Sequence, residues 1–268
     1  MRSGLAMSGG SPVPTAGDSA DGPLSDVVAE AARLLDSAGE SGLEVRLLGG
    51  VAIAMRVSPG EPPFLPREYR DIDLIVGRGT RAGVDALMLT GGYRADPEFN
   101  ALNGHRRLLY YDDGHGRQVD VFVGGFSMCH TIPLGDRLFA EPRTLPLSEL
   151  LLTKLQVVEL NEKDQSDILS VLYHHDVGDR DGDMINGSRV GEICAKDWGL
   201  FRTVELNIER STEALRQREL GEQASGRLAS QLGKLSEWIQ TAPKSAKWKM
   251  RARVGDRVRW YEQPEEVG

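Results

Sequence analysis

Two short apolar segments of this chain carry aspartates where a buried strand would place hydrophobic side chains. Asp71 and Asp73 begin the segment 71–76, and Asp120 lies inside the segment 118–123. Because side chains alternate across a strand, Asp71 and Asp73 project from one face, with Cα atoms about 6–7 Å apart. Neither strand propensity nor burial favours an aspartate inside an apolar strand. Each of the three aspartates therefore needs a partner that compensates its negative charge. The pattern therefore predicts a sheet in which one face gathers carboxylates.

The first half of the chain alternates predicted strands with helices and then forms a hairpin. Apolar residues recur at helical spacing from residue 25 until Gly39 ends the pattern. The predicted elements that follow are strands over 43–48 and 71–76, helices over 51–56 and 82–89, and a hairpin of 105–111 with 118–123. This order indicates a small mixed α/β sheet.

The second half has the apolar spacing of amphipathic helices. Helices are predicted over 147–160, 166–173, 190–194, 200–220 and 224–239. Together they indicate a helical bundle packed on the sheet, hence an α+β fold. The polar stretch 176–188, which is rich in Gly and Asp, is expected to be a flexible connector.

Composition divides the chain into four regions. Residues 1–23 are rich in Gly, Ser, Ala, Pro and Asp and have almost nothing to bury, which is typical of a disordered leader. The other regions that we expect are an α/β core over 24–145, a helical region over 146–242 and a basic C-terminal segment over 243–268.

Overall charge and cysteine usage exclude several classes of protein. The net charge is −8 and the sequence pI is about 5.3, which gives no support for coating nucleic acid through global charge. Cys129 and Cys194 stand far apart without a CxxC motif, which argues against a disulfide scaffold or a zinc site and fits a reducing compartment. No apolar run reaches the ~18 residues of a membrane span, and no secretory signal opens the chain. We therefore expect a cytoplasmic protein with no membrane partner.

The three aspartates are the candidate metal ligands. Two carboxylates as close as those of Asp71 and Asp73 repel each other unless protons or a cation compensate them. Mg²⁺ supplies that compensation, because it prefers oxygen ligands. If Asp120 bound the same metal ion, its negative charge would be compensated as well. Two simpler interpretations stay open: a solvated pair of aspartates at a sheet edge, and an Asp120 paired with Arg106 or Arg107.

Gly49 and Gly50 mark the turn from a predicted strand into a helix. Glycine allows a ligand to approach the backbone closely, and a helix N-terminus offers free N–H groups to phosphate. Together with the carboxylates, the pair indicates a site for a nucleoside triphosphate and a metal ion, although a lone Gly-Gly is most often a turn. A dinucleotide-binding fold is rejected, because G-x-G-x-x-G is absent and a proline-rich loop follows.

Three runs of the sequence resemble the nucleotidyltransferase superfamily that includes DNA polymerase beta: LLGGVAIAMR, REYRDIDLIV and RQVDVFV. A later run, LPLSELLLTKLQVVELNEKDQSDILSVL, resembles the AbiEii-type toxin nucleotidyltransferases, in which a lysine-bearing helix precedes a (K/R)D-x-x-D segment. The resemblance covers residues 43–175. It implies a small mixed-sheet nucleotidyltransferase domain followed by a helical bundle, and a toxin–antitoxin or phage-defence context with a cognate antitoxin as partner.

Position by position, the resemblance implies a role for each candidate site residue. Asp71 and Asp73 would bind metal, and Asp120 would be a third ligand that helps to deprotonate the acceptor hydroxyl. The remaining implied roles are triphosphate contact by Lys154, orientation of Lys154 or the nucleotide by Asp164 or Asp167, and nucleotide binding by Gly49, Gly50 and Arg67. The implied cofactor is Mg²⁺, as two ions, with Mn²⁺ as an alternative, and the substrate is an NTP.

The residues alone leave alternatives for the second half of this site. Lys154 is equally a solvated helix position, and Asp164 and Asp167 are equally charges at a helix N-terminus. Two departures from the family pattern leave the shape of the acceptor pocket open. The spacing between the Gly-Gly pair and the first aspartate is longer than usual, and Tyr69 stands where Thr is common.

These features favour an enzyme that transfers a nucleoside monophosphate from an NTP to an acceptor hydroxyl. The expected acceptor is RNA, such as a tRNA end, because the C-terminal segment mixes Lys and Arg with Trp248, Trp260 and Tyr261. A strand pair with an exposed charged face would explain the same segment. Two other functions stay open: a small-molecule nucleotidyltransferase of the aminoglycoside-modifying kind, and a non-catalytic nucleotide-sensing or antitoxin-binding module.

Overall fold

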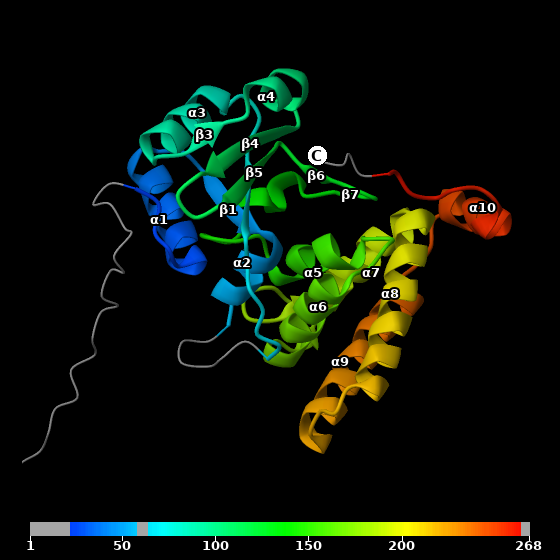
Figure 1. Cartoon of the computed structure of the whole chain (residues 1–268). Coiled ribbons are helices and arrows are strands. Elements are labelled where there is room, and N and C mark those ends of the chain that lie inside the picture. Colours follow the sequence, from blue (N-terminus) through cyan, green and yellow to red (C-terminus); the bar gives the residue numbers. More distant parts are fainter. Residues whose placement is uncertain (1–21, 58–63, 264–268) are drawn as a thin grey trace, which may run out of the picture.

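The computed structural model describes residues 22–57 and 64–263, and it contains a sheet part and a helical part (Figure 1). Between residues 147 and 263 the regular elements are helices and two short strands. The predicted α+β class is confirmed. Nearly all of the predicted leader, residues 58–63 of the proline-rich loop and the last five residues of the C-terminal segment lie outside the described residues.

The sheet has five strands in the order β1-β2-β5-β4-β3. β2 and β5 run parallel to each other, whereas the other neighbours are antiparallel. The predicted hairpin is the pair β4–β5. The strands span Val45–Leu48 (β1), Asp71–Val76 (β2), Arg94–Ala95 (β3), Arg107–Asp112 (β4) and Arg117–Val123 (β5).

The neighbouring strands β2 and β5 are apolar on the face that turns away from the aspartates. Ile72 and Leu74 of β2 and Val119 and Val121 of β5 are each at most 1% exposed. Helix α1 (Val27–Glu40) packs against β1 and β2. Because one face carries the apolar core residues, the polar residues of the same strands are left on the opposite face.

Shorter elements complete the sheet part of the molecule. They are α2 (Gly49–Met55), α3 (Arg81–Thr90), α4 (Pro97–Asn103), β6 (Phe126–Ser127), β7 (Thr131–Ile132) and a 3₁₀ helix (Gly135–Phe139). Helix α4 was not among the predicted elements. Its start signals are ordinary ones, since Asp96 caps it and Pro97 occupies its first turn.

The helical part contains most of the predicted helices. They are α5 (Leu147–Leu155), α6 (Glu162–His174), α7 (Gly187–Lys196), α8 (Trp198–Gln217) and α9 (Glu222–Thr241), followed by α10 (Ala246–Val254). Helix α5 ends at Leu155, earlier than predicted, and Asn161 caps the next helix by accepting a hydrogen bond from the Asp164 amide. Helices α8 and α9 pack together as a hairpin far from the sheet (Figure 1). None of the helices in the described part of the chain combines the length and the apolar character needed to cross a membrane.

The stretch 176–188 is ordered by specific contacts, so its prediction as a flexible connector is wrong. It contains a short parallel strand pair, β8 (Val177–Gly178) and β9 (Ile185–Asn186). Arg137 donates to both carboxylate oxygens of Asp181, at 3.0 and 2.8 Å. Polar composition suggested solvation here, whereas the polar groups are used in ion pairs with the rest of the protein.

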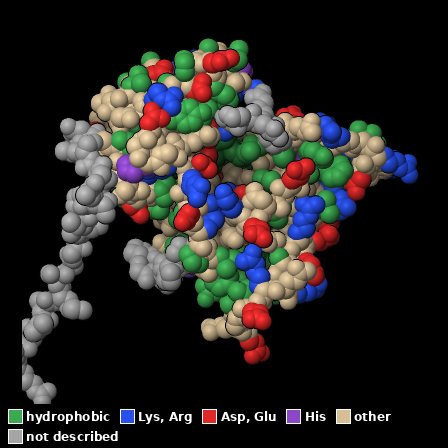
Figure 2. All heavy atoms as spheres, in the orientation of Figure 1, with side chains coloured by type: hydrophobic (Ala, Val, Ile, Leu, Met, Phe, Trp, Pro, Cys, Tyr) green, Lys and Arg blue, Asp and Glu red, His purple; other side chains and the backbone are tan. Residues whose placement is uncertain are grey.

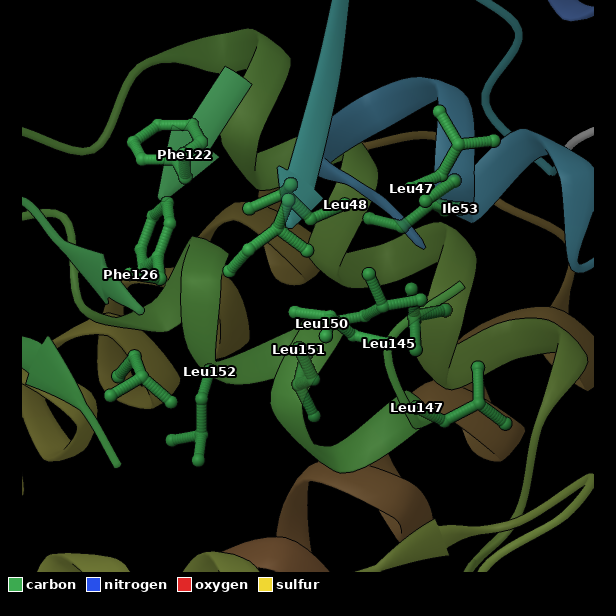
Figure 3. Packing of buried hydrophobic residues seen from close by; sticks show 14 of the residues in the cluster. Leu47, Leu48, Ile53, Phe122, Phe126, Leu145, Leu147, Leu150, Leu151 and Leu152 are labelled. Atoms are coloured by element: carbon green, nitrogen blue, oxygen red, sulfur yellow. The ribbon is translucent and has the colours of Figure 1, made fainter. Parts of the chain in front are cut away.

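Helix α5 joins the sheet part to the helical part through one hydrophobic core (Figure 3). Its leucines at positions 147, 150, 151 and 152 are each at most 1% exposed. Close to them in Figure 3 lie residues of β1, α2 and β5, namely Leu47, Leu48, Ile53 and Phe122. Because this burial fixes α5 against the sheet, Lys154 in the last turn of α5 is held at a defined place beside the sheet.

The described residues of the basic C-terminal segment form α10 and a 3₁₀ turn (Gly255–Arg257) and no strand, so the interpretation of this segment as a strand pair is wrong. Trp248 of α10 donates its indole N–H to the Cys194 carbonyl at 3.0 Å, and Trp260 donates to Thr203 Oγ1 at 3.0 Å. Both tryptophans are half-buried. They hold the segment on α7 and α8 and are not free platforms for stacking bases.

Candidate active site

The three predicted metal ligands lie on one face of β2 and β5. Asp73 is directly opposite Asp120 in the parallel register, and Asp71 is opposite Gln118. Since side chains alternate, these four residues share a face of the sheet, which we call the carboxylate face. Asp71 is exposed, Asp73 is half-buried and Asp120 is buried. The fold therefore brings together the two segments that strand alternation singled out.

The carboxylate of Asp73 lies against the backbone at the start of α2. Gly49, the first residue of α2, has a φ of +71°, a conformation that L side chains rarely adopt. A Cβ atom at Gly49 would lie 2.9 Å from Asp73 Cγ and closer still to Asp73 Oδ2. Glycine is therefore required here both by the backbone and by the neighbouring carboxylate.

Asp71 and Asp73 lack compensating partners of their own. Within the described residues, neither side chain accepts a hydrogen bond or forms an ion pair. Burial, followed by the negative charge of Asp120, raises the pKa of Asp73 to about 7. The same two causes raise the pKa of Asp71. The face therefore favours binding of either protons or a cation.

Asp120, in contrast, has two partners. Arg107 Nε donates to Asp120 Oδ1 at 2.7 Å, and Gln118 Nε2 donates to Asp120 Oδ2 at 2.8 Å. Pairing of Asp120 with Arg107 was one of the simpler interpretations of the sequence, and the structure contains that pair. In the part of the chain that is described, no three His, Cys, Asp or Glu side chains form a group that could hold a metal ion.

The donor chemistry of the carboxylate face nevertheless fits a hard divalent cation. Asp71 and Asp73 offer carboxylate oxygens that no other described side chain occupies, and oxygen is the ligand that Mg²⁺ and Mn²⁺ prefer. These two residues would hold the ion. Asp120 would join them once it exchanged its bonds to Arg107 and Gln118 for the metal.

A chain of ion pairs lies beside the carboxylate face. Lys154 Nζ, at the end of α5, is 3.0 Å from Asp164 Oδ1 and 2.9 Å from Asp167 Oδ2 on α6. Arg67 donates to both carboxylate oxygens of Asp167, at 2.9 and 2.8 Å. Asp167 is only 1% exposed, so one buried carboxylate holds two cations in place.

Lys154 is not a solvated position on a helix surface. Its side chain is largely buried. Burial lowers its pKa, but the charges of Asp167 and Asp164 outweigh burial and raise it, and Asp73 adds to the rise. Lys154 therefore stays protonated between the two acids of α6 and the carboxylate face. Asp164 does lie in the first turn of α6, as the alternative interpretation expected, whereas Asp167 is buried beyond that turn.

Arg67 and Tyr69 approach the second glycine of the pair. The Arg67 guanidinium lies over the Tyr69 ring, 4.2 Å from the ring centroid. A Cβ atom at Gly50 would lie 2.8 Å from Tyr69 Cε1 and closer still to Arg67 Nη2. Each glycine thus admits one side chain of the site, Asp73 at Gly49 and Arg67 at Gly50. Phosphate binding by the glycines stays a prediction.

Gln118 and Tyr69 touch the site residues but were not predicted to do so. The signal for Gln118 was present, because it stands two residues before Asp120, just as Asp71 stands two residues before Asp73. Tyr69 follows Arg67 by the same spacing. In both cases, the i, i+2 rule that identified the aspartates also identifies their neighbours.

Both signs of charge meet on the face of the molecule that Figure 2 draws. Figure 2 shows Lys and Arg side chains close to Asp and Glu side chains around a hollow between the sheet part and the helical part. An anion accompanied by a metal ion is complementary to such a surface, since the anion contacts the cations and the metal contacts the carboxylates.

No protein-family model and no curated protein matches the chain. Among solved structures, the chain is similar to an antigenic nucleotidyltransferase-like protein from Paracoccidioides brasiliensis, with 14% identity and a TM-score of 0.31. The match covers 82% of this chain and 94% of that chain. Similarity at this level is too weak to assign a function.

Proposed function

We propose that this protein is a metal-dependent nucleotidyltransferase that moves a nucleoside monophosphate from an NTP to an acceptor hydroxyl. One observation carries the proposal. Asp71 and Asp73 form no ion pair among the described residues, and they lie close enough to Lys154, which Asp167 holds together with Arg67, for its charge to lower their pKa values. A nucleoside triphosphate with its metal ion complements both halves, because the metal neutralises the carboxylates and the triphosphate neutralises the cations.

The position of each site residue indicates its role in the proposed reaction. Lys154 and Arg67 would bind triphosphate oxygens and neutralise the charge on the departing pyrophosphate. The acceptor oxygen bonds to the α-phosphorus while the bond from that phosphorus to the pyrophosphate oxygen breaks. Asp120 would take the hydroxyl proton. Mg²⁺ held by Asp71 and Asp73 would stabilise charge on the attacking and leaving oxygens.

Asp167 and Asp164 act in this proposal as positioning residues. Asp167 accepts from both Lys154 and Arg67, and Asp164 fixes the other side of the lysine ammonium group. Without the two carboxylates, the cations would spread over many rotamers, and binding the triphosphate would have to order them.

We further propose RNA, such as a tRNA end, as the acceptor. Support comes from exposed basic side chains in the C-terminal segment, which could track a phosphate backbone. They are Lys247, Lys249, Arg253, Arg257 and Arg259. A toxin–antitoxin or phage-defence context with a cognate antitoxin follows from the family resemblance of the sequence.

A second candidate function is non-catalytic nucleotide binding. The observation that favours it is the bond of Arg107 and Gln118 to Asp120, which neutralises the carboxylate that catalysis would need. A protein of this kind would bind an NTP through Lys154 and Arg67 without consuming it.

Release of pyrophosphate separates the two functions. The full-length protein is incubated with each of the four NTPs, Mg²⁺ and total RNA, and pyrophosphate is measured by a coupled assay. We expect Mg²⁺-dependent release by the wild type and loss of at least about 100-fold in Asp73→Asn, because charge stabilisation by the metal would be lost. NTP binding without release by the wild type would identify the non-catalytic module.

A further inference from the structure

A cavity of about 490 Å³ is lined in part by Arg107, which bonds to Asp120 on the carboxylate face. Its walls come from the ends of β4 and β5, the β6–β7 hairpin and Glu262 near the C-terminus. Cavities of this volume commonly bind small molecules or parts of larger ones. Neither Lys154 nor Arg67 lines it, so the proposed triphosphate site does not account for it.

The charged groups in this cavity are mostly guanidinium groups. Arg78, Arg106 and Arg107 line it, against a single carboxylate from Glu262. Arg107 is bonded to Asp120, and Arg106 also has a partner. Arg78 makes no hydrogen bond or ion pair with any residue that the structure describes. The excess of positive charge attracts anions and repels cations.

Part of the cavity wall is apolar. The rings of Phe122 and Phe126 lie 5.0 Å apart at an interplanar angle of 55°, and both side chains are buried. Ile132 and Leu134 extend this wall. Guanidinium groups beside an apolar wall suit a ligand that carries a phosphate next to a ring.

Arg107 connects the cavity to the carboxylate face through a hydrogen bond. Arg107 lies over the Phe122 ring, with Cζ 5.4 Å from the centroid, and its Nε contacts Asp120 Oδ1 at 2.7 Å. A ligand in the cavity that drew Arg107 toward its phosphate would release Asp120 Oδ1. Other polar groups of the same ligand would then lie beside the Asp120 carboxylate.

We infer that this cavity binds the acceptor and that the acceptor is a ribonucleotide unit, an inference that rests on the proposed function. Arg78 and Arg107 bind its phosphate, and Phe122 and Phe126 contact its ring. Its hydroxyl faces Asp120, which takes the proton as the new oxygen–phosphorus bond forms and pyrophosphate leaves. A cationic aminoglycoside is excluded, because its amino groups would face the three arginines.

Calorimetric titration of the full-length protein with the diribonucleoside monophosphate ApA tests the inference without NTP or metal. Adenosine and kanamycin are titrated in parallel. We expect ApA to bind at least about tenfold more tightly than adenosine, since one charged hydrogen bond is worth about that factor. Kanamycin is expected not to bind. Arg78→Gln should weaken ApA binding about tenfold, and Arg78 is exposed, so the change should not disturb folding.

Two matched variants distinguish the cavity from other sites. Arg216→Gln removes an exposed arginine on α8, and Arg180→Gln removes an exposed arginine between β8 and β9. Both should bind ApA within about twofold of the wild type. Equal ApA affinity of Arg78→Gln and wild type, no ApA binding by the wild type, or binding of kanamycin would each overturn the inference.

Failure of the inference and failure of the proposed function give different results. If the protein releases pyrophosphate but Arg78→Gln binds ApA as tightly as the wild type does, the proposed function holds and the inference about the cavity is wrong. A protein that never releases pyrophosphate but binds ApA through Arg78 has the ribonucleotide cavity without the proposed reaction.

Discussion

The carboxylate of Asp73 occupies the space that a side chain at Gly49 would fill. The strand-to-helix turn and the carboxylate face are therefore built around each other. Gly49 adopts a positive φ that turns the chain from β1 into α2, and the missing Cβ leaves room for Asp73 on the neighbouring strand. A substitution at Gly49 should therefore alter the environment of Asp73, and a substitution at Asp73 that of Gly49.

Gly49→Ala should lower the free energy of unfolding by roughly 2 kcal/mol or more, from backbone strain and the clash with Asp73. Urea denaturation measures it. Gly233→Ala is the matched control, since Gly233 lies inside α9 and no side chain other than those of its chain neighbours lies within 4 Å of the place that a Cβ would occupy. This control should be more stable than the wild type by about 0.5–1 kcal/mol. Wild-type stability of Gly49→Ala would contradict the described contact.

The raised pKa of Asp73 predicts how stability depends on pH in the absence of divalent metal. A folded-state pKa of about 7, above the unfolded value, means that the folded protein holds the proton more tightly. This contribution to stability is fully present below about pH 4 and is lost as pH rises through 7. Asp73→Asn should therefore gain stability relative to the wild type between those values, by up to about 4 kcal/mol at pH 8.

The control for this experiment is Asp136→Asn, an exposed aspartate outside the site. Its stability relative to the wild type should be the same at pH 4 and pH 8. Thermal or urea unfolding in the presence of EDTA gives both differences. If Asp73→Asn also kept a constant difference from pH 4 to pH 8, the environment assigned to Asp73 would be wrong.

Asp167 should matter more for stability than its neighbour Asp164. Asp167→Asn leaves Lys154 and Arg67 without the buried carboxylate that holds both, and it should cost about 3–5 kcal/mol. Asp164→Asn removes a single, more accessible contact and should cost about 1 kcal/mol. Urea denaturation of both variants at pH 7 measures the ranking. Equal costs would show that Asp167 does not link the two cations.

The exposed basic residues of α10 should contribute to RNA affinity without supporting the fold. Lys249→Gln and Arg253→Gln should each weaken RNA binding and reduce the slope of log affinity against log salt by about one. Arg216→Gln on α8 is the control and should change neither. Filter binding across a salt series gives affinity and slope together. Unchanged slopes in both α10 variants would rule out this surface.

Local rules made the carboxylate face predictable. The i, i+2 spacing on a strand places Asp71 and Asp73 on one face whatever the rest of the fold does. The apolar spacing over 147–160 likewise predicted an amphipathic helix, and residues Leu147–Leu155 form α5. The class of fold followed from the order of such local patterns.

Local spacing rules do not predict contacts between segments that are distant in the sequence. Arg67 and Asp167 are 100 residues apart in the chain, and their pairing depends on how α6 packs beside α2. The bond of Arg107 to Asp120 was one of two local options, and only the hairpin register selects it. The acceptor cavity needs four separate segments to close around it, which no single stretch of sequence encodes.

The central claim is tested most directly by transfer of label from an α-³²P-NTP. Full-length protein is incubated with Mg²⁺ and either total RNA or a panel of aminoglycosides, and EDTA controls remove the metal. We predict Mg²⁺-dependent labelling of RNA alone, and its loss in Asp71→Asn and Asp73→Asn. Full labelling by either variant, or no labelling of any acceptor by the wild type with any of the four NTPs, would contradict the proposed site and reaction.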